Sequence, residues 1–134
     1  MAGHGFGRNE RWRSFKKYWM PVVLYAGFIF YISSIPSPVP LVTVDLSILH
    51  VPMFLVLSYL AARALSGGSQ KFGGRNPILA AIIITAIYGV LDEFHQLYVP
   101  GRTFSLLDIG FDFLGGCLIV FKPWWEKLFE KVNL

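Results

Sequence analysis

Acidic and other polar side chains cluster in the C-terminal half of this 134-residue chain, inside segments that are otherwise apolar. Two carboxylates, a histidine and an amide fall within five residues, and an arginine and two aspartates follow: Asp92, Glu93, His95, Gln96, Arg102, Asp108 and Asp112. Ionisable groups at membrane depth are costly, so they usually face a protein interior or a watery cavity and mark a functional site. We therefore expect a site where these residues meet.

The residue types in this cluster suggest proton transfer and ligand binding. Asp92 or Glu93 could act as a general base, since buried carboxylates near like charges are tuned for proton transfer. Arg102 could hold a phosphate or carboxylate of a ligand. The further candidate binding residues are His50, Gln96, Asp108 and Asp112.

A metal site is a weaker alternative. Asp92 and His95 have the i, i+3 spacing that helical bundles use for carboxylate and histidine ligands, and these ligands suit zinc, manganese or iron. That spacing is common by chance, so we predict no cofactor and keep a divalent cation open. The chain has no nucleophile elbow and no HExxH motif, so covalent hydrolase chemistry has no specific support.

A purely structural role is the competing interpretation. Arg102 could pair with one of the acids and Gln96 could bond a neighbour, which would fix how the helices pack. His50 lies close to Pro52 at a predicted helix start, where a packing role is as reasonable as a site role. His95 could simply be solvated near the membrane surface.

Composition predicts an all-α membrane protein. Hydrophobic residues make up 54% of the chain and charged residues 15%, which is too apolar for an ordinary soluble domain. A helix needs roughly 20 mostly apolar residues to span a bilayer. We predict one domain, residues 1–134, a bundle of four transmembrane helices at about 18–35, 46–65, 77–99 and 105–121.

Both ends of the chain have the pattern of interfacial helices. Met1 to Lys17 interleaves basic and aromatic residues, and aromatic and aliphatic residues after Pro123 recur at helical spacing. The first apolar run is long for a signal peptide and lacks small residues at cleavage spacing, so we expect it to be retained. Cys117 is the single cysteine, which excludes an internal disulfide.

Positive charge predicts the orientation. With both termini in the cytoplasm, eleven of the twelve lysines and arginines lie on the cytoplasmic side, and Arg102 is the exception. The net charge of +4 is then a topology signal, so we do not expect a nucleic-acid partner. In this topology Asp45, His50 and the whole C-terminal cluster lie in the outer half of the membrane.

Helical geometry predicts which faces meet. Asp108 and Asp112 share a face at i and i+4, and Gly115 and Gly116 continue it with small residues that allow close packing. We expect the third and fourth helices to pack with their acidic faces together. Their carboxylates then need a partner, which could be Arg102, a retained proton or a bound cation.

The pattern of these residues resembles the VanZ-like family of small bacterial membrane proteins. The matching positions are Tyr88-Gly89, Asp92-Glu93, Gln96, Pro100-Gly101-Arg102, Ser105, Asp108 and Gly115, with Ser33-Ser34-Ile35-Pro36 and His50 upstream. The resemblance implies a multi-pass bundle in the bacterial cytoplasmic membrane. The family's namesake is linked to resistance to the glycopeptide antibiotic teicoplanin.

The chain departs from the family pattern at three places. Leu46 and Ser47 stand where the family commonly has an Asp-Lys pair, and Asp112 stands where it favours asparagine. His95 matches no family position. The missing lysine leaves more acid without a fixed positive partner.

Two functional hypotheses follow, and they differ in class. In the first, the cluster binds or modifies a lipid-linked or amphiphilic envelope molecule, with membrane lipids and a lipid-linked precursor as partners. In the second, the protein is a non-enzymatic structural or interaction protein, and its polar network only holds the bundle together. Neither the reaction, if there is one, nor the oligomeric state follows from the sequence.

Overall fold

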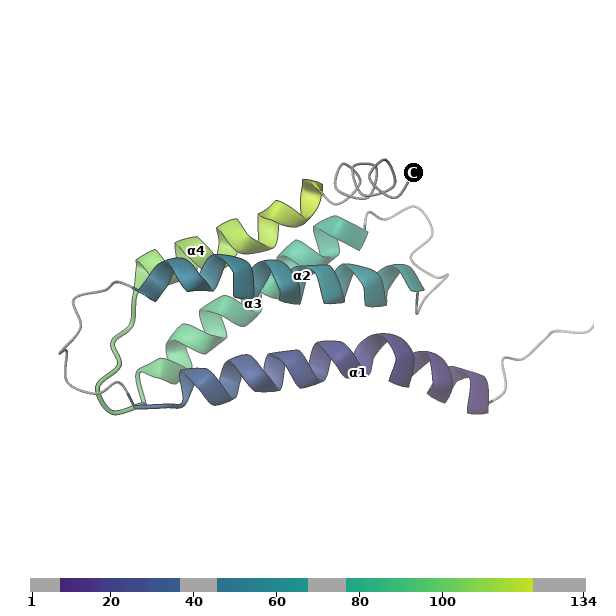
Figure 1. Cartoon of the computed structure of the whole chain (residues 1–134), viewed down its shortest axis with the longest axis horizontal. Helices are drawn as coiled ribbons and strands as arrows, with labels where there is room; N and C mark the ends of the chain where they lie inside the picture. The colour runs from purple at the N-terminus through teal and green to yellow at the C-terminus, as the bar shows by residue number, and fades with distance from the viewer. Residues whose placement is uncertain (1–7, 37–45, 68–76, 122–134) are drawn as a thin grey trace, which may run out of the picture.

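The computed structural model describes residues 8–36, 46–67 and 77–121, and their regular secondary structure is entirely helical (Figure 1). The elements in chain order are α1 (Arg8–Ser33), η1 (Leu46–Leu49), α2 (His50–Gly67), α3 (Pro77–Gln96), α4 (Leu106–Cys117) and η3 (Leu118–Phe121). The all-α class with four helices is therefore confirmed. Asp45, most of the 66–76 connection and the predicted C-terminal helix lie outside the described residues.

Helix α2 is the centre of the bundle. It packs against α1, α3 and α4, and α3 packs in turn against α4. The end of α1, the start of α2, the end of α3 and the start of α4 lie together at one end of the bundle, on the left in Figure 1. This arrangement brings the polar segments of all four helices to the same level.

The first helix begins earlier than the sequence predicts. The basic segment is not a separate surface helix, because α1 runs continuously from Arg8 to Ser33 and includes Pro21. Nothing before that proline breaks the helix, and proline inside a helix removes one backbone hydrogen bond and usually bends it. Figure 1 shows α1 bent in its N-terminal part.

The third helix ends at Gln96 instead of Val99. The Tyr98 and Val99 amides donate to the carbonyls of His95 and Gln96, three residues back. These i→i−3 bonds tighten the chain into a turn that leads to Gly101, whose φ is 78°. Glycine suits that left-handed conformation because it has no Cβ.

The fourth helix starts where the sequence predicts. Ser105 is its N-cap, and the Ser105 hydroxyl accepts a hydrogen bond from the Asp108 amide at 3.2 Å. The α-helical part ends at Cys117, and the 3-10 helix η3 continues to Phe121. The predicted end at 121 is thus reached with a narrower last turn.

Two of the four predicted spans meet the length and polarity expected of a membrane helix. They are Ser47–Gly67 and Pro77–Gln96. Helix α1 carries basic residues in its first half, and α4 has only 12 residues before η3. Spans by α1 and α4 stay predictions.

The bundle is apolar outside, and its interior combines an apolar core with several buried polar side chains. Large hydrophobic side chains are exposed along all four helices, among them Leu24, Phe28, Val56, Ile83, Ile87, Leu91, Phe94 and Phe113. Buried polar side chains include Ser58, Thr85, Asp92, Glu93, Gln96 and Asp112. Buried carboxylates beneath an exterior of large apolar side chains are unusual for a water-soluble domain and suit a lipid-facing exterior.

Close helix contacts depend on glycine. A Cβ at Gly115 of α4 would collide with the Val51 carbonyl of α2 and lie 3.1 Å from the Phe54 Cβ. A Cβ at Gly116 would lie 3.3 Å from Thr85 of α3. The two glycines therefore let α4 approach both neighbours, as the small-residue pattern predicts.

This packing gives the first prediction. Gly115→Ala should destabilise the protein by about 1–3 kcal/mol, because the Val51 carbonyl is backbone and cannot move aside easily. Gly110→Ala is the matched control, since it lies in the same helix with nothing within 4 Å of an added Cβ. Thermal unfolding in detergent should show a loss for the first variant and none for the second. Equal melting temperatures would contradict the α2–α4 contact.

Candidate functional site

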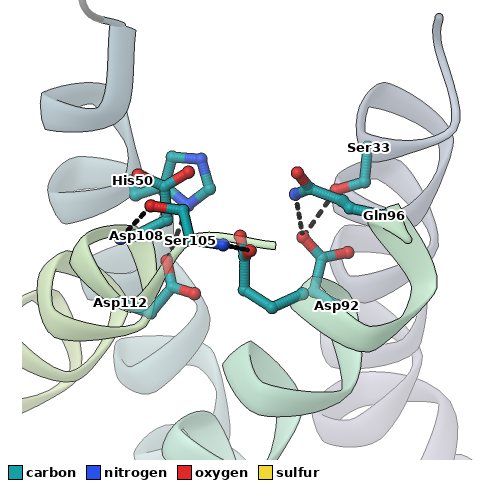
Figure 2. A network of polar contacts seen from close by, with 8 residues as sticks. Ser33, His50, Asp92, Gln96, Ser105, Asp108 and Asp112 are labelled. Carbon is teal, nitrogen blue, oxygen red and sulfur yellow. Dashed lines mark hydrogen bonds and ion pairs between the residues drawn. The ribbon is translucent and has the colours of Figure 1, made fainter. Parts of the chain in front are cut away.

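The polar cluster gathers residues from every long helix at one end of the bundle (Figure 2). Ser33 comes from the end of α1, His50 from the start of α2, Asp92 and Gln96 from the last turns of α3, and Asp108 from the start of α4. The acidic faces of α3 and α4 do lie together, as expected. The site residues that the structure describes therefore lie at the same end of the bundle, as the sequence predicts.

Asp92 is held by two donors. The Ser33 hydroxyl donates to Asp92 Oδ2 at 2.6 Å, and Gln96 Nε2 donates to the same oxygen at 3.2 Å. The carboxylate is only 4% exposed, and its other oxygen, Oδ1, has no hydrogen-bond partner among the described residues. This contact ties the end of α1 to α3.

Asp112 pairs with His50. His50 Nδ1 and Asp112 Oδ1 are 2.8 Å apart, which is the one ion pair found among the described residues. Asp112 Oδ2 has no partner there and faces Gly89 of α3, where an added Cβ would lie 2.7 Å from it. Gly89 thus makes room for a buried carboxylate between the two helices.

Glu93 is linked to the start of α4. The Ser105 amide donates to Glu93 Oε2 at 2.8 Å, while the Ser105 hydroxyl caps the helix at Asp108. Glu93 is fully buried, and its Oε1 has no partner in the described part of the chain. Asp108 Oδ1 is likewise buried without one. Ser105 therefore holds the Glu93 carboxylate and caps the helix that carries Asp108.

Arg102 does not bind an acid in this structure. Its Nε donates to the Ile35 carbonyl at 3.3 Å and its Nη2 to the Ile32 carbonyl at 3.4 Å. A guanidinium has five N–H donors, so these two bonds leave others for a ligand. The suggestion that Arg102 neutralises a carboxylate is not what the structure shows, because the carbonyls at the end of α1 are closer.

His95 lies beside α1 instead of in the acidic cluster. Its Nε2 is 2.9 Å from Ser34 Oγ, and its ring stacks on Phe30 with centroids 4.2 Å apart. The Ser34 hydroxyl donates to the Phe30 carbonyl at 2.7 Å, so His95 must donate to the serine. A serine nucleophile would need to donate to its base. In the Ser34–His95 pair the hydrogen bond runs the other way, from the histidine to the serine, so Ser34 is not arranged as a nucleophile.

The proposed metal ligands have separate partners. Asp92 bonds to Ser33 and Gln96, and His95 bonds to Ser34. Within residues 8–36, 46–67 and 77–121, no group of three or more histidine, cysteine or acidic side chains is placed to hold a metal ion.

Sequence reasoning missed the role of the serines at the end of α1. Ser33 and Ser34 entered only as part of the family resemblance, yet Ser33 gives Asp92 its shortest hydrogen bond. Two hydroxyls that close an apolar run were the available signal. Thr85 was also missed, and its buried hydroxyl has no partner among the described residues.

Four acids thus share one end of the bundle with too few donors. Asp92, Glu93, Asp108 and Asp112 each keep one buried oxygen without a hydrogen bond from the described residues. Buried polar groups are normally satisfied, and exceptions in a native structure often indicate a missing ligand or water. The arrangement is therefore suited to accept hydrogen bonds from a guest molecule or to hold protons.

The second prediction tests the Asp92 contact. Ser33→Ala should lower the free energy of unfolding by about 1–3 kcal/mol, because a buried carboxylate loses a donor. Ser34→Ala is the control, since the Ser34 hydroxyl bonds to the Phe30 carbonyl and the His95 ring and to no carboxylate. Melting curves in detergent should rank Ser33→Ala well below Ser34→Ala. The reverse ranking would show that Asp92 is held some other way.

Comparison with known proteins identifies a family. Searches of curated proteins and of solved structures each found no significant match. Residues 22–124, which include every site residue above, match the family described as VanZ/LLP1. That match covers most of the chain, and the chain belongs to the VanZ/LLP1 family.

Proposed function

We propose that this protein binds or modifies a lipid-linked or amphiphilic molecule of the bacterial cell envelope at its acidic site. In this proposal the chain crosses the cytoplasmic membrane four times with both termini in the cytoplasm. The site then lies in the outer half of the bilayer, next to the head groups of the outer leaflet. Glycopeptide susceptibility is the cellular property that such an activity would affect.

One observation carries the proposal. Four acids from α3 and α4 each have a buried oxygen without a donor among the described residues. Leaving a buried acceptor unpaired costs about 1–3 kcal/mol, so a network that served only to hold helices together would be expected to satisfy its members. Unused acceptors in one place favour a site that a guest completes.

The side chains have distinct roles in this proposal. Glu93 and Asp92 lie on α3, where either could take a proton from a bound molecule. Asp108, Asp112 and His50 line the α2–α4 side, and Gln96 orients Asp92. Arg102, in the connection between α3 and α4, donates to two carbonyls near the end of α1 and has further N–H donors with which it could hold a phosphate or carboxylate.

A structural role is the second candidate, and specific contacts favour it. The Ser33–Asp92 bond joins α1 to α3, and the Ser105–Glu93 bond joins α4 to α3. If holding the bundle were the whole role, Glu93→Gln would lower stability and any cellular effect together. If the site binds a guest, Glu93→Gln would fold normally and lose only the cellular effect.

The third prediction is a cellular one. Cells expressing wild type should differ from an empty vector in glycopeptide or lipoglycopeptide susceptibility, and Glu93→Gln or Arg102→Ala should abolish the difference at matched protein levels. Glu10→Gln makes the same acid-to-amide change at an exposed position of α1 and should behave as wild type. Retained activity in the two site variants would remove these residues from the mechanism.

The fourth prediction concerns topology. Reporters that work only in the cytoplasm should be active after Leu134 and within residues 66–76, and reporters that work only outside should be active after Pro38. The reason is the excess of lysine and arginine in the segments assigned to the cytoplasm. An outside signal from residues 66–76 would move the acidic site to the other leaflet.

A further inference from the structure

A second charged region lies at the end of the bundle opposite the acids, on the right in Figure 1, where α1 begins and α2 ends. Helix α1 presents four exposed cations there and α2 adds a half-buried one: Arg11, Arg13, Lys16, Lys17 and Arg63. Glu10 is the one acid among the described residues of this end. The region therefore carries positive charge that the described residues do not balance.

Two of these cations, from different helices, lie at the same aromatic ring. Lys17 Nζ is 5.1 Å from the centroid of the Tyr18 ring, and Arg63 Cζ is 5.5 Å from that centroid. We call Lys17, Tyr18 and Arg63 the α1–α2 junction. Neither cation forms an ion pair with a carboxylate of the described residues. Since like charges that share one ring repel each other, an anion bound beside them lowers the energy of both.

The end of α2 fixes the ring of this junction. A Cβ at Gly67 would lie 2.6 Å from Tyr18 Cε1, so the ring occupies space that a larger residue would need. The other side of Tyr18 packs against a buried apolar cluster that includes Val22 and Phe54. The junction is therefore built on packed residues of two helices, and the fixed ring gives both cations a common anchor.

The spacing along α1 places the junction near a head-group layer. Tyr18 precedes Ser33, which binds Asp92 at the acidic end, by fifteen residues. At the α-helical rise this is roughly 23 Å, against roughly 30 Å for the hydrocarbon core of a bilayer. With the acids near one head-group layer, the junction lies near the other.

Aromatic side chains beside the junction agree with this depth. Trp12 and Phe15 are exposed and stack with their ring centroids 5.8 Å apart. Lys16 Nζ lies 5.4 Å from the centroid of the Trp12 ring. Exposed aromatic rings mixed with cations are typical of the boundary between membrane and water.

An anionic phospholipid has the chemistry that this region requires. A guanidinium binds phosphate through two parallel N–H bonds, and an ammonium adds a compact second donor. Further along α1, Met20, Val23 and Leu24 are exposed apolar side chains against which acyl chains can lie. A soluble anion would contact the cations alone, while a phospholipid contacts both the cations and the apolar face.

We propose that the α1–α2 junction binds the phosphate of an anionic phospholipid in the leaflet opposite the acids. Arg63 and Lys17 donate to the phosphate oxygens, and Tyr18 keeps the two cations together. Arg13 and Lys16 add attraction to a negatively charged membrane surface. This inference goes beyond the proposed function, because it needs α1 to lie in the membrane but makes no use of the acids.

Two phospholipids with the same acyl chains test the head-group preference. The full chain is purified in a maltoside detergent, and its melting temperature is followed as dioleoyl phosphatidylglycerol or dioleoyl phosphatidylcholine is added at low mole fraction, where the micelle surface carries little charge. We expect phosphatidylglycerol to stabilise the protein at about tenfold lower mole fraction, because charge-assisted hydrogen bonds to its phosphate are not opposed by a choline cation.

Variants separate the junction from general positive charge. Arg63→Gln and Lys17→Gln should each remove most of the preference for phosphatidylglycerol. Lys17 is exposed, so its variant should fold even if Arg63→Gln does not. Arg11→Gln is the matched control, because it removes the same charge from an exposed position of α1 outside the junction. Tyr18→Phe keeps the ring, and both of these variants should keep the preference.

A soluble head group tests whether the acyl chains matter. Glycerol 1-phosphate carries the phosphate of phosphatidylglycerol without acyl chains, and it is titrated against the same preparation. We expect no stabilisation over the concentrations at which the lipid acts, because the apolar face of α1 gains nothing from it. Equal stabilisation by glycerol 1-phosphate would show that the junction takes a soluble anion and would reject the lipid.

Two further results would overturn the inference. If the two phospholipids act alike on wild type, the junction does not select an anionic lipid. If Arg11→Gln costs as much of the preference as Arg63→Gln and Lys17→Gln, the preference comes from net charge and not from the junction. These outcomes are separate from the cellular assay, which depends on Glu93 and Arg102 at the other end of the bundle.

Discussion

Burial of carboxylates inside a bundle with an apolar exterior is the constraint on which the rest of this structure depends. An ionised carboxylate removed from water is costly unless donors surround it. The fold provides donors for one oxygen of each of three acids, through Ser33 and Gln96 for Asp92, Ser105 for Glu93, and His50 for Asp112. These contacts link all four helices at one end, so the position of each helix end matters to the site.

The close approach of α3 and α4 follows from the same constraint. The Asp112 side chain can face α3 only because residue 89 is glycine. Helix α4 can pack closely against α2 only because residue 115 is glycine. Ser105 then caps α4 while its amide reaches Glu93. Small residues and one capping serine therefore help to fix where the acids lie, and each acid keeps one buried oxygen without a hydrogen-bond partner among the described residues.

The sequence predicted the helices and their common polar end well. Apolar runs bounded by proline and glycine mark helix limits, and short connections force neighbouring helix ends together. The capping role of Ser105 followed from its place before an apolar run. Helix α1 begins earlier than predicted for a simple reason, since the basic segment contains no residue that stops a helix before Pro21.

Hydrogen-bond partners were harder to predict. Arg102 was expected near an acid and binds carbonyls of α1, and Ser33 was not expected to bind Asp92. Partner choice depends on how each helix is rotated about its axis. Helices with apolar residues on nearly every side give little periodicity from which to infer that rotation. The acids could therefore be placed at one level, but not matched with their donors.

The most direct test of the account is a high-resolution structure of the protein purified in nanodiscs made from native lipid. The account predicts non-protein density within hydrogen-bond distance of Glu93 Oε1, Asp108 Oδ1 and Asp112 Oδ2, with the contacts of Ser105 and His50 unchanged. Carboxyl groups that instead bond directly to one another through shared protons, with no guest between them, would contradict it.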